Sequence, residues 1–473
     1  MPEIIIIGAG PGGYAAAFEA ARTGASVTLA EKTAIGGTCL HAGCIPTKTI
    51  RASADALETS RRLNEFGIMT GSTPMPIFHA NMAAILARKE KVRSTLCGSL
   101  EKTCAALKVR LVHGQAELRP DRTVLLYTDK GNEELHGDAV IIATGSKTFE
   151  LPTLPVDHIN ILNSDDALNL DHIPQRMLVV GGGVIGCELA FIFRAFGSEV
   201  TIVEAQNRIL PLSSVDEEIS RLLQRESKKR GIRLMLAQTV KNAVISDGKA
   251  VCVLAPSPFV KNAAGSEITV ETEAVLVAVG RAPDTDGLNL SGAGVATDAQ
   301  GWIIADDRMR TSAEGVYAIG DALGPGRVML AHAASAEGLC AVANCLGKET
   351  RMDYSVIPAA IFTSPEIGIV GFSEAHAQQQ GLKVRSSLFQ YRAMGKSHAM
   401  GELSGFFKLV CEEGSGKILG AHIAGAHATD IIAEAALAVQ NGLTAAQLAR
   451  TVHAHPTLPE GMYEAATAWL QAQ

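Results

Sequence analysis

Two cysteines, Cys39 and Cys44, lie five residues apart in a segment that begins with a glycine pair and ends with a proline and a lysine. In a straight α-helix this spacing gives about 7.5 Å of rise and about 140° of rotation, which misses the roughly 4.4–6.8 Å Cα separation that a disulfide needs. Gly43 and Pro46 permit a backbone bend near a helix start. A disulfide closed across such a bend is strained and readily reduced, as dithiol redox chemistry requires. The alternative is a pair of unrelated buried thiols.

A glycine-rich segment near the start of the chain predicts a site for a dinucleotide. Gly8-Ala9-Gly10-Pro11-Gly12-Gly13 follows the apolar run Ile4–Ile7, which is typical of a buried strand, and precedes an alanine-rich helical stretch. This glycine spacing lets the backbone approach a pyrophosphate at the helix N-terminus. Glu31 ends the next strand, 23 residues after Gly8, where it can accept hydrogen bonds from a ribose. The alternative is a tight turn between a strand and a helix.

The same pattern occurs a second time. Gly181-Gly182-Gly183-Val184-Ile185-Gly186 follows the strand Met177–Val180, and Glu204 again comes 23 residues after the first glycine. The two units, 173 residues apart, indicate an internal duplication and therefore two dinucleotides in one chain. A carboxylate suits a free ribose 2′-OH and would repel a 2′-phosphate, so the second site is expected to prefer NAD to NADP.

Further buried strands and helices must position these segments. Apolar strands are predicted at Ala139–Ala143, Ala274–Val279 and Val316–Ile319, the last followed by Gly320 and Asp321. Asp321 is placed either to bind a polyol or ribose, or to cap the next helix. Long helices over Ala52–Glu65 and Met82–Leu107 are expected to cover the sheet. The remaining cysteine pairs with helical spacing (Cys97 with Cys104, Cys340 with Cys345) are expected to be core thiols.

The sequence pattern changes after Asp353. Alternating strands are predicted at Pro358–Phe362, Ile367–Val370, Phe406–Val410 and Ile418–Ile423, followed by a helix from Asp430 to Asn441 with Gly442 at its C′ position and a capping box at Thr444 and Gln447. We interpret this part as a separate α+β domain. It ends in a loop with two histidines, His453 and His455, and then Glu460 at the start of the last helix.

Composition excludes several classes of protein. A chain of 473 residues predicts about three domains. The net charge is −7 and no basic block is present, so nucleic acid is not an expected partner. No apolar run approaches 18 residues, so no membrane span is expected. Nine scattered cysteines argue against a secreted disulfide scaffold and for a reducing compartment, the cytoplasm. No metal site is predicted.

Over essentially its whole length the chain resembles the pyridine nucleotide–disulfide oxidoreductases, most closely their dihydrolipoamide dehydrogenase branch. The resemblance rests on both glycine fingerprints, Gly36–Lys48, Ala143-Thr144-Gly145, Gly320-Asp321, Leu330-Ala331-His332, and His455-Pro456-Thr457 with Glu460. It implies an α/β fold with two Rossmann-like domains, for FAD and NAD, and a C-terminal α+β dimerisation domain. The expected boundaries are 1–149 for the FAD domain, 150–280 for the NAD domain, 281–350 for a central segment that completes the FAD site, and 351–473 for the interface domain.

The resemblance also implies roles for individual residues. Cys39 would be the interchange thiol and Cys44 the thiol next to the flavin, with Lys48 paired to Glu188 near the flavin ring. His455, oriented by Glu460, would act as the base across a homodimer interface, and His453 is its rival. The expected FAD contacts are Gly8, Gly10, Gly12, Gly13, Glu31, Lys32, Thr38, Lys48, Ala116, Thr144, Gly145, Ser146, Asp321 and Ala331. The expected NAD contacts are Gly181, Gly183, Gly186, Glu204, Val240, Ala278, Gly280 and Arg281.

The implied activity is NAD⁺-dependent reoxidation of dihydrolipoamide on the lipoyl domains of 2-oxo acid dehydrogenase or glycine cleavage complexes. The segment Gly36–Lys48, called the redox segment below, departs from the family pattern in two places: His41-Ala42 replaces Asn-Val, and Thr47 replaces Ser. Both departures are expected to tune the disulfide without abolishing it. Two alternatives remain open. One is a glutathione- or mercuric-reductase-like enzyme, against which Glu204 and the absence of a C-terminal cysteine pair argue. The other is a mainly structural docking subunit, against which the intact redox residues argue.

Overall fold

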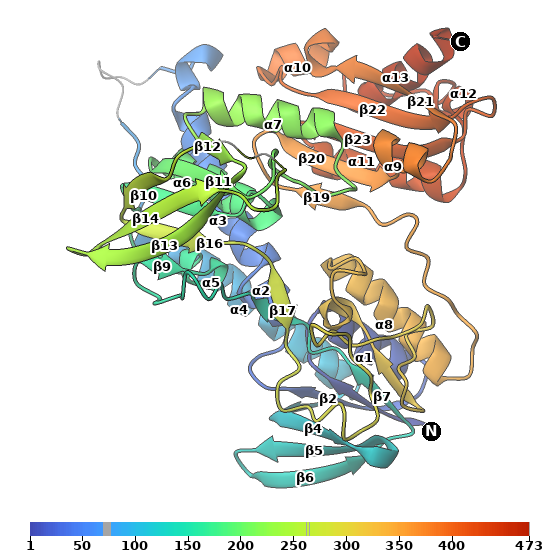
Figure 1. Ribbon diagram of the computed structural model, residues 1–473. Coiled ribbons are helices and arrows are strands. Elements are labelled where there is room, and N and C mark those ends of the chain that lie inside the picture. The colour runs from blue at the N-terminus through green and yellow to red at the C-terminus, as the bar shows by residue number, and fades with distance from the viewer. Residues whose placement is uncertain (70–76, 262, 264, 473) are drawn as a thin grey trace.

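The computed structural model describes residues 1–69, 77–261, 263 and 265–472. The structure contains three α/β bodies (Figure 1). Two are built on parallel sheets, and the third, at the C-terminal end, is built on an antiparallel sheet. No helix among these described residues is both long and apolar enough to cross a membrane.

The first body contains a parallel five-stranded sheet in the order β18-β7-β1-β2-β3. Its strands, in chain order, are β1 (Glu3–Ile7), β2 (Ser26–Glu31), β3 (Arg110–His113), β7 (Ala139–Ile142) and β18 (Val316–Ala318). The isoleucines of β1 are buried on both faces, as a parallel sheet covered on both sides requires. Helix α1 (Pro11–Arg22) packs against α8 (Ala331–Cys345) so closely that a Cβ on Gly338 would lie 2.7 Å from the Gly12 carbonyl oxygen.

The remaining elements of this body cover its edges. Helices α2 (Gly37–His41) and α3 (Cys44–Ser60) contain the redox segment, and α4 (Met82–Ala106) follows them, with a short 3₁₀ turn η1 (Leu63–Phe66) between α3 and α4. An antiparallel meander joins β4 (Gln115–Arg119), β5 (Thr123–Thr128) and β6 (Gly131–His136), with η2 (Pro120–Arg122) between the first two.

The second body repeats the parallel arrangement in the order β12-β11-β10-β16-β9. Its strands are β9 (Ile161–Leu162), β10 (Arg176–Val180), β11 (Glu199–Glu204), β12 (Arg233–Leu236) and β16 (Ala274–Val277). An antiparallel sheet of β13 (Gln238–Ser246), β14 (Lys249–Pro256) and β15 (Ile268–Thr272) lies beside it, and the helices are α5 (Ser164–Ala167), α6 (Val184–Phe196) and α7 (Glu217–Lys229).

A two-stranded antiparallel ladder connects these two bodies. Strand β8 (Ser146–Thr148) leads out of the first body and β17 (Arg281–Pro283) leads back into it, with Thr148 opposite Arg281 (Figure 1). The chain therefore enters and leaves the second body at one place.

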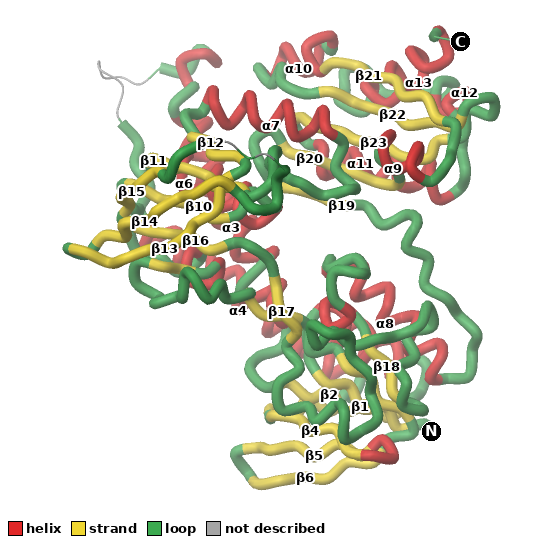
Figure 2. Tube along the Cα trace, viewed as in Figure 1, coloured by secondary structure: helices red, strands yellow, loops and turns green. Residues whose placement is uncertain are grey.

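The third body is an antiparallel sheet in the order β19-β20-β23-β22-β21 (Figure 2). Its strands are β19 (Ala359–Ile361), β20 (Glu366–Gly371), β21 (Val384–Gln390), β22 (Phe406–Glu412) and β23 (Ile418–Gly425). Its helical elements are α9 (Glu374–Gln379), η4 (Tyr391–Ala393), α10 (Gly395–Met400), α11 (Ala428–Gln440), α12 (Ala445–Leu448) and α13 (Glu460–Gln471). An extended connection from α8 reaches it (Figure 1).

A buried charge cluster joins the second and third bodies. The Lys408 side chain is 3% exposed, and its ammonium lies 3.1 Å from Asp216, 3.1 Å from Glu218 and 2.9 Å from Glu374. Two of these carboxylates belong to the start of α7 and one to α9. Since an unpaired buried charge is costly, this cluster fixes α7 on the C-terminal sheet.

Most of the predicted elements are present, with shifted ends. The strand expected over Ala274–Val279 ends at Val277, the helix expected from Asp430 begins at Ala428, and the helix expected from Ala52 already begins at Cys44. Thr444 and Gln447 form the predicted capping box. The sequence-based prediction missed β4, β6, β8, β9, β12 to β15, β17 and β21. Strands β13 and β14 form a hairpin across Asp247 and Gly248, a local turn signal that the prediction did not use.

Candidate functional site

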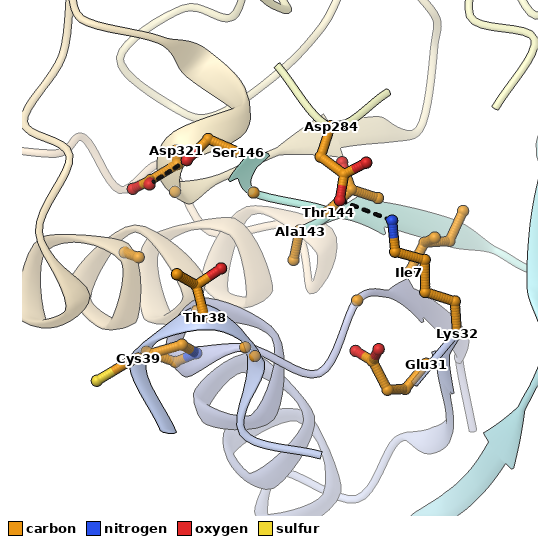
Figure 3. Close-up of a pocket in the computed structure, with 18 of the residues that line it drawn as sticks. Ile7, Glu31, Lys32, Thr38, Cys39, Ala143, Thr144, Ser146, Asp284 and Asp321 are labelled. Carbon is orange, nitrogen blue, oxygen red and sulfur yellow. Dashed lines mark hydrogen bonds and ion pairs between the residues drawn. The ribbon is translucent and has the colours of Figure 1, made fainter. Parts of the chain in front are cut away.

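A cavity of about 560 Å³ opens at the carboxyl ends of β1, β7 and β18. Figure 3 shows Glu31, Thr38, Cys39, Thr144 and Asp321 arranged around it. The cavity is lined by most of the residues predicted for the flavin site: Gly8, Gly10, Gly12, Glu31, Lys32, Thr38, Ala116, Thr144, Gly145, Ser146, Asp321 and Ala331, together with both redox cysteines. Two predicted contacts are not part of the lining, Gly13 and Lys48.

The glycines of the first fingerprint serve close backbone packing. Gly8 has φ +101°, and a Cβ there would lie 2.3 Å from the Ala143 carbonyl oxygen. A Cβ on Gly13 would lie 1.8 Å from the Gly8 carbonyl oxygen, so this residue allows the helix to approach the strand rather than touching the cavity. No side chain caps the N-terminus of α1, which leaves its first N–H groups facing the cavity for an anion.

The second fingerprint has the same geometry. Gly181 has φ +109°, and its Cβ would lie 2.3 Å from the Ala278 carbonyl oxygen, while a Cβ on Gly186 would lie 2.0 Å from the Gly181 carbonyl oxygen. Glu204 accepts a hydrogen bond from the Gly182 N–H at 2.7 Å, as Glu31 accepts one from the Ala9 N–H at 2.8 Å. The duplication read from the sequence is therefore present in the backbone and in both carboxylates.

One buried polar atom in the first cavity has no partner. The hydroxyl oxygen of Thr144 is inaccessible to water and makes no hydrogen bond, although Thr144 lines the cavity. An unsatisfied buried hydroxyl costs free energy unless a ligand supplies its partner. The uncapped helix N-terminus, the Glu31 carboxylate and this hydroxyl together fit a dinucleotide such as FAD.

The two redox cysteines lie on either side of a break in the helix. Helix α2 ends at His41 and α3 begins at Cys44, with Gly43 between them in a non-helical conformation. A Cβ on Gly43 would lie 2.9 Å from the Thr38 carbonyl oxygen, so glycine permits this bend. The predicted bend is confirmed, and both sulfurs are present as thiols.

The thiols interact unequally with their surroundings. A hydrogen bond from the Cys39 thiol, aided by the Lys48 ammonium, lowers the pKa of Cys44 to about 7. The same hydrogen bond, together with burial, raises the pKa of Cys39. Cys44 is therefore the sulfur that carries the thiolate, and Cys39 is the sulfur that keeps the proton.

Lys48 contacts groups from all three bodies. Its ammonium lies 2.9 Å from Glu188 of α6 and 4.3 Å from the ring centroid of Phe362. Glu188 is buried and also accepts a hydrogen bond from the Phe362 N–H at 2.9 Å. This pair, predicted from the resemblance, fixes a cation behind the redox segment.

Arg281 is hydrogen-bonded to Ser146, a residue that lines the first cavity. Its guanidinium donates to the carbonyl oxygen of Ser146 at 2.6 Å and also to the Ser146 hydroxyl. That hydroxyl donates to the Asp321 carboxylate at 2.6 Å (Figure 3). Asp321 caps no following helix, because the N-cap of α8 is Leu330, and its carboxylate faces the cavity instead.

Both departures from the family pattern form local hydrogen bonds. His41 Nε2 lies 3.0 Å from the Ile35 carbonyl oxygen and its Nδ1 lies 3.2 Å from the Arg93 guanidinium, and these contacts anchor α2 to α4. Thr47 donates to the Gly43 carbonyl at 2.6 Å, which closes the first turn of α3.

The two C-terminal histidines differ in what they can accept. His455 is 78% exposed, and its Nδ1 donates to Glu460 at 2.8 Å, so Nε2 keeps a free lone pair. His453 is 8% exposed, and its two ring nitrogens face the acceptors Glu434 and Thr451. Glu460 also accepts the Thr457 N–H, and both hydrogen bonds lower its pKa. Of these two rings, only that of His455 has a nitrogen that faces no acceptor among the described residues of the chain.

Some predicted residues lie elsewhere, and some lining residues were missed. Val240 packs into the core of the second body. Neither His455 nor Glu460 lines the cavity. The lining residues that were not predicted include Thr33, His41, Gln115, Asp284, Asp286, Leu288 and Met329. The Lys32 ammonium lies 2.7 Å from the Asp284 carboxylate (Figure 3). The two residues are 252 positions apart, so no local sequence pattern predicts this contact.

Comparison with known proteins gives consistent matches. A family model described as pyridine nucleotide-disulphide oxidoreductase matches residues 2–338, and the dimerisation domain of that family matches residues 357–466. The dihydrolipoyl dehydrogenase of Chlamydia muridarum is 38% identical over 98% of this chain and 96% of its own. That of Haloferax volcanii is 37% identical over 98% of this chain and 95% of its own. The crystal structure of LpdA from Mycobacterium tuberculosis superposes with a TM-score of 0.90 at 27% identity, covering 99% of both chains.

Proposed function

The chain belongs to the pyridine nucleotide-disulphide oxidoreductase family, and from this premise we propose that it oxidises dihydrolipoyl groups with NAD⁺. It is a flavoprotein disulfide oxidoreductase that uses FAD and NAD, and its C-terminal body is a dimerisation domain. The observation that carries the proposal is the Cys39–Cys44 pair, held beside Lys48 at the wall of a cavity with a dinucleotide-binding geometry.

The first cavity is the proposed FAD site. The α1 N-terminus would bind the pyrophosphate, Glu31 the ribose, and Asp321 the ribityl hydroxyls. Bound FAD supplies the two-electron chemistry that links the protein dithiol to NAD⁺. The second fingerprint would hold NAD, and the Glu204 carboxylate disfavours a 2′-phosphate.

The cysteines and His455 divide the thiol chemistry between them. A dihydrolipoyl thiol gives its proton to Nε2 of His455, and its sulfur bonds to Cys39 Sγ as the Cys39–Cys44 bond breaks and the electron pair leaves on Cys44. The second substrate thiol then displaces Cys39, which closes the lipoyl disulfide and leaves the protein as a dithiol. Cys44 suits the leaving role because its pKa is lowered to about 7.

We propose that His455 of one protomer serves the partner subunit's Cys39. His455 and Glu460 stand outside the cavity that holds Cys39 in the same chain, and the chain contains the family's dimerisation domain. The hydrogen bond to Glu460 orients the ring and would stabilise the imidazolium after proton transfer.

The wider assignments are proposals too. We divide the chain at 149/150, 280/281 and 350/351, supported by β18, which brings the third segment into the first sheet. The expected partners are lipoyl domains, and the expected location is the cytoplasm, since the nine cysteines are scattered along the sequence and do not form the pattern of a secreted disulfide scaffold.

One experiment separates the candidate activities. Purified protein should be yellow and should oxidise dihydrolipoamide with NAD⁺ far faster than with NADP⁺, because Glu204 faces the ribose. A parallel assay of glutathione reduction with NADPH should show little turnover. Comparable use of NADP⁺ would refute the Glu204 argument, and colourless protein without dithiol activity would support a docking subunit instead.

A further inference from the structure

A buried carboxylate beneath the first cavity has no role in the chemistry described so far. Glu337 of α8 is 0% exposed and does not line the cavity. Its Oε2 accepts a hydrogen bond from the Gly320 N–H at 2.6 Å, and its Oε1 accepts one from the Tyr354 hydroxyl at 2.6 Å. Burial raises the pKa of Glu337, so the protein maintains this group at a cost that its two donors must offset.

The first donor belongs to the turn that presents Asp321. Gly320 has φ +69° and opens the 3₁₀ turn η3 (Gly320–Leu323), and both Gly320 and Asp321 line the cavity. Glu337 holds this turn through the Gly320 N–H, while the Ser146 hydroxyl holds the Asp321 carboxylate from the other side. Without Glu337 the Gly320 N–H loses its acceptor, and the turn is free to shift.

The second donor lies on the connection that leads from α8 to the C-terminal body. Tyr354 is half-buried under the guanidinium of Arg327, which lies 4.8 Å from its ring centroid. Burial, and the hydrogen bond to Glu337, raise the pKa of Tyr354, so the phenol remains a donor. Glu337 therefore joins the flavin-facing turn to a segment outside the cavity.

We propose that Glu337 is a positioning residue for the flavin. It fixes the Gly320–Asp321 turn so that the Asp321 carboxylate already faces the ribityl hydroxyls before the cofactor binds. This inference rests on the proposed function, which assigns the cavity to FAD. It predicts that Glu337 controls FAD affinity through hydrogen bonding, without touching the cofactor.

The test compares variants that remove or keep an acceptor at this position. Glu337→Leu removes the acceptor, and the dissociation constant for FAD, measured by reconstituting flavin-free protein, should rise by about tenfold or more. Glu337→Gln keeps a carbonyl oxygen for the Gly320 N–H and should raise it by less than about threefold. Tyr354→Phe removes only the second donor and should have an equally small effect.

A matched control separates positioning from general loss of stability. Glu226 is also a buried glutamate on a helix and accepts a hydroxyl hydrogen bond, from Ser404 at 2.8 Å, but it lies on α7 and not at the cavity. Glu226→Leu and Glu337→Leu should both lower the unfolding temperature of the flavin-free protein, yet only Glu337→Leu should weaken FAD binding. Equal FAD affinity in these two variants would overturn the proposal.

A double-mutant cycle tests the route of the effect. In an Asp321→Ala background, Glu337→Leu should change FAD affinity by less than about twofold, because the group that it positions is gone. Additive losses would overturn the proposal, and so would a Glu337→Gln variant as weak as Glu337→Leu. Wild-type protein that binds no FAD would instead contradict the proposed function, so the two failures are distinguishable.

Discussion

The thiolate character of Cys44 depends on a hydrogen bond that a single substitution can remove. Cys39→Ala deletes the donor and leaves Lys48 in place. The pKa of Cys44 is lowered from 9.0 to about 7, so the surroundings favour the thiolate by about 3 kcal/mol. Since the Cys39 thiol is the largest contributor, we expect the Cys39→Ala variant to titrate closer to 9 than to 7.

The rate of alkylation by iodoacetamide reports this change, because only the thiolate reacts. At pH 7 about half of Cys44 is thiolate in the wild type, and the alkylation rate of Cys44 should fall by about tenfold or more in Cys39→Ala. Cys39→Ser is the matched control, because its hydroxyl still donates to the thiolate and should keep the pKa of Cys44 well below 9.0. Mass spectrometry locates the modified residue. If Cys39→Ala and Cys39→Ser titrate alike near pH 7, Lys48 and not the neighbouring thiol sets the pKa, and the reasoning is refuted.

Three more substitutions test other parts of the structure. Gly181→Ala places a Cβ 2.3 Å from a backbone oxygen, so KM for NAD⁺ should rise by about tenfold or more with FAD content unchanged; parallel loss of flavin would contradict two independent sites. His455→Gln should slow dihydrolipoamide turnover by about 10²-fold, whereas His453→Gln should have a much smaller effect, and the reverse order would assign the base to His453. Lys408→Met leaves the buried carboxylate of Asp216 and the partly exposed carboxylates of Glu218 and Glu374 without their cation and should cost about 3–5 kcal/mol in chemical denaturation; a loss under about 1 kcal/mol would show that the cluster is solvated.

The sequence predicted those parts of the site that depend on local backbone chemistry. The glycine fingerprints could be read because each position needs a missing side chain for a close approach within a few residues, as at Gly8 and Gly181. The redox bend could be read because five residues of straight helix cannot join two cysteines. These are constraints that neighbouring residues impose on one another.

Contacts between distant segments could not be read in the same way. The resemblance placed Arg281 at the second dinucleotide site, but it gave no sign of the hydrogen bond from Arg281 to Ser146, 135 residues away. Glu337 follows an ordinary helical pattern, and its function depends on where Gly320 and Tyr354 come to lie. The choice between His455 and His453 likewise depended on which acceptors surround each ring.

The ladder between β8 and β17 has a consequence for how such enzymes diversify. Thr148 and Arg281 are opposite each other, and paired residues in an antiparallel ladder have Cα atoms only about 5 Å apart. The segment 149–280 therefore begins and ends at nearly the same point. A different domain could replace this segment without changing the strand order of the first sheet. Preference for one nicotinamide coenzyme over another can then evolve by exchange of this segment, and the thiol chemistry is kept only if the new segment supplies a carboxylate for Lys48 in place of Glu188.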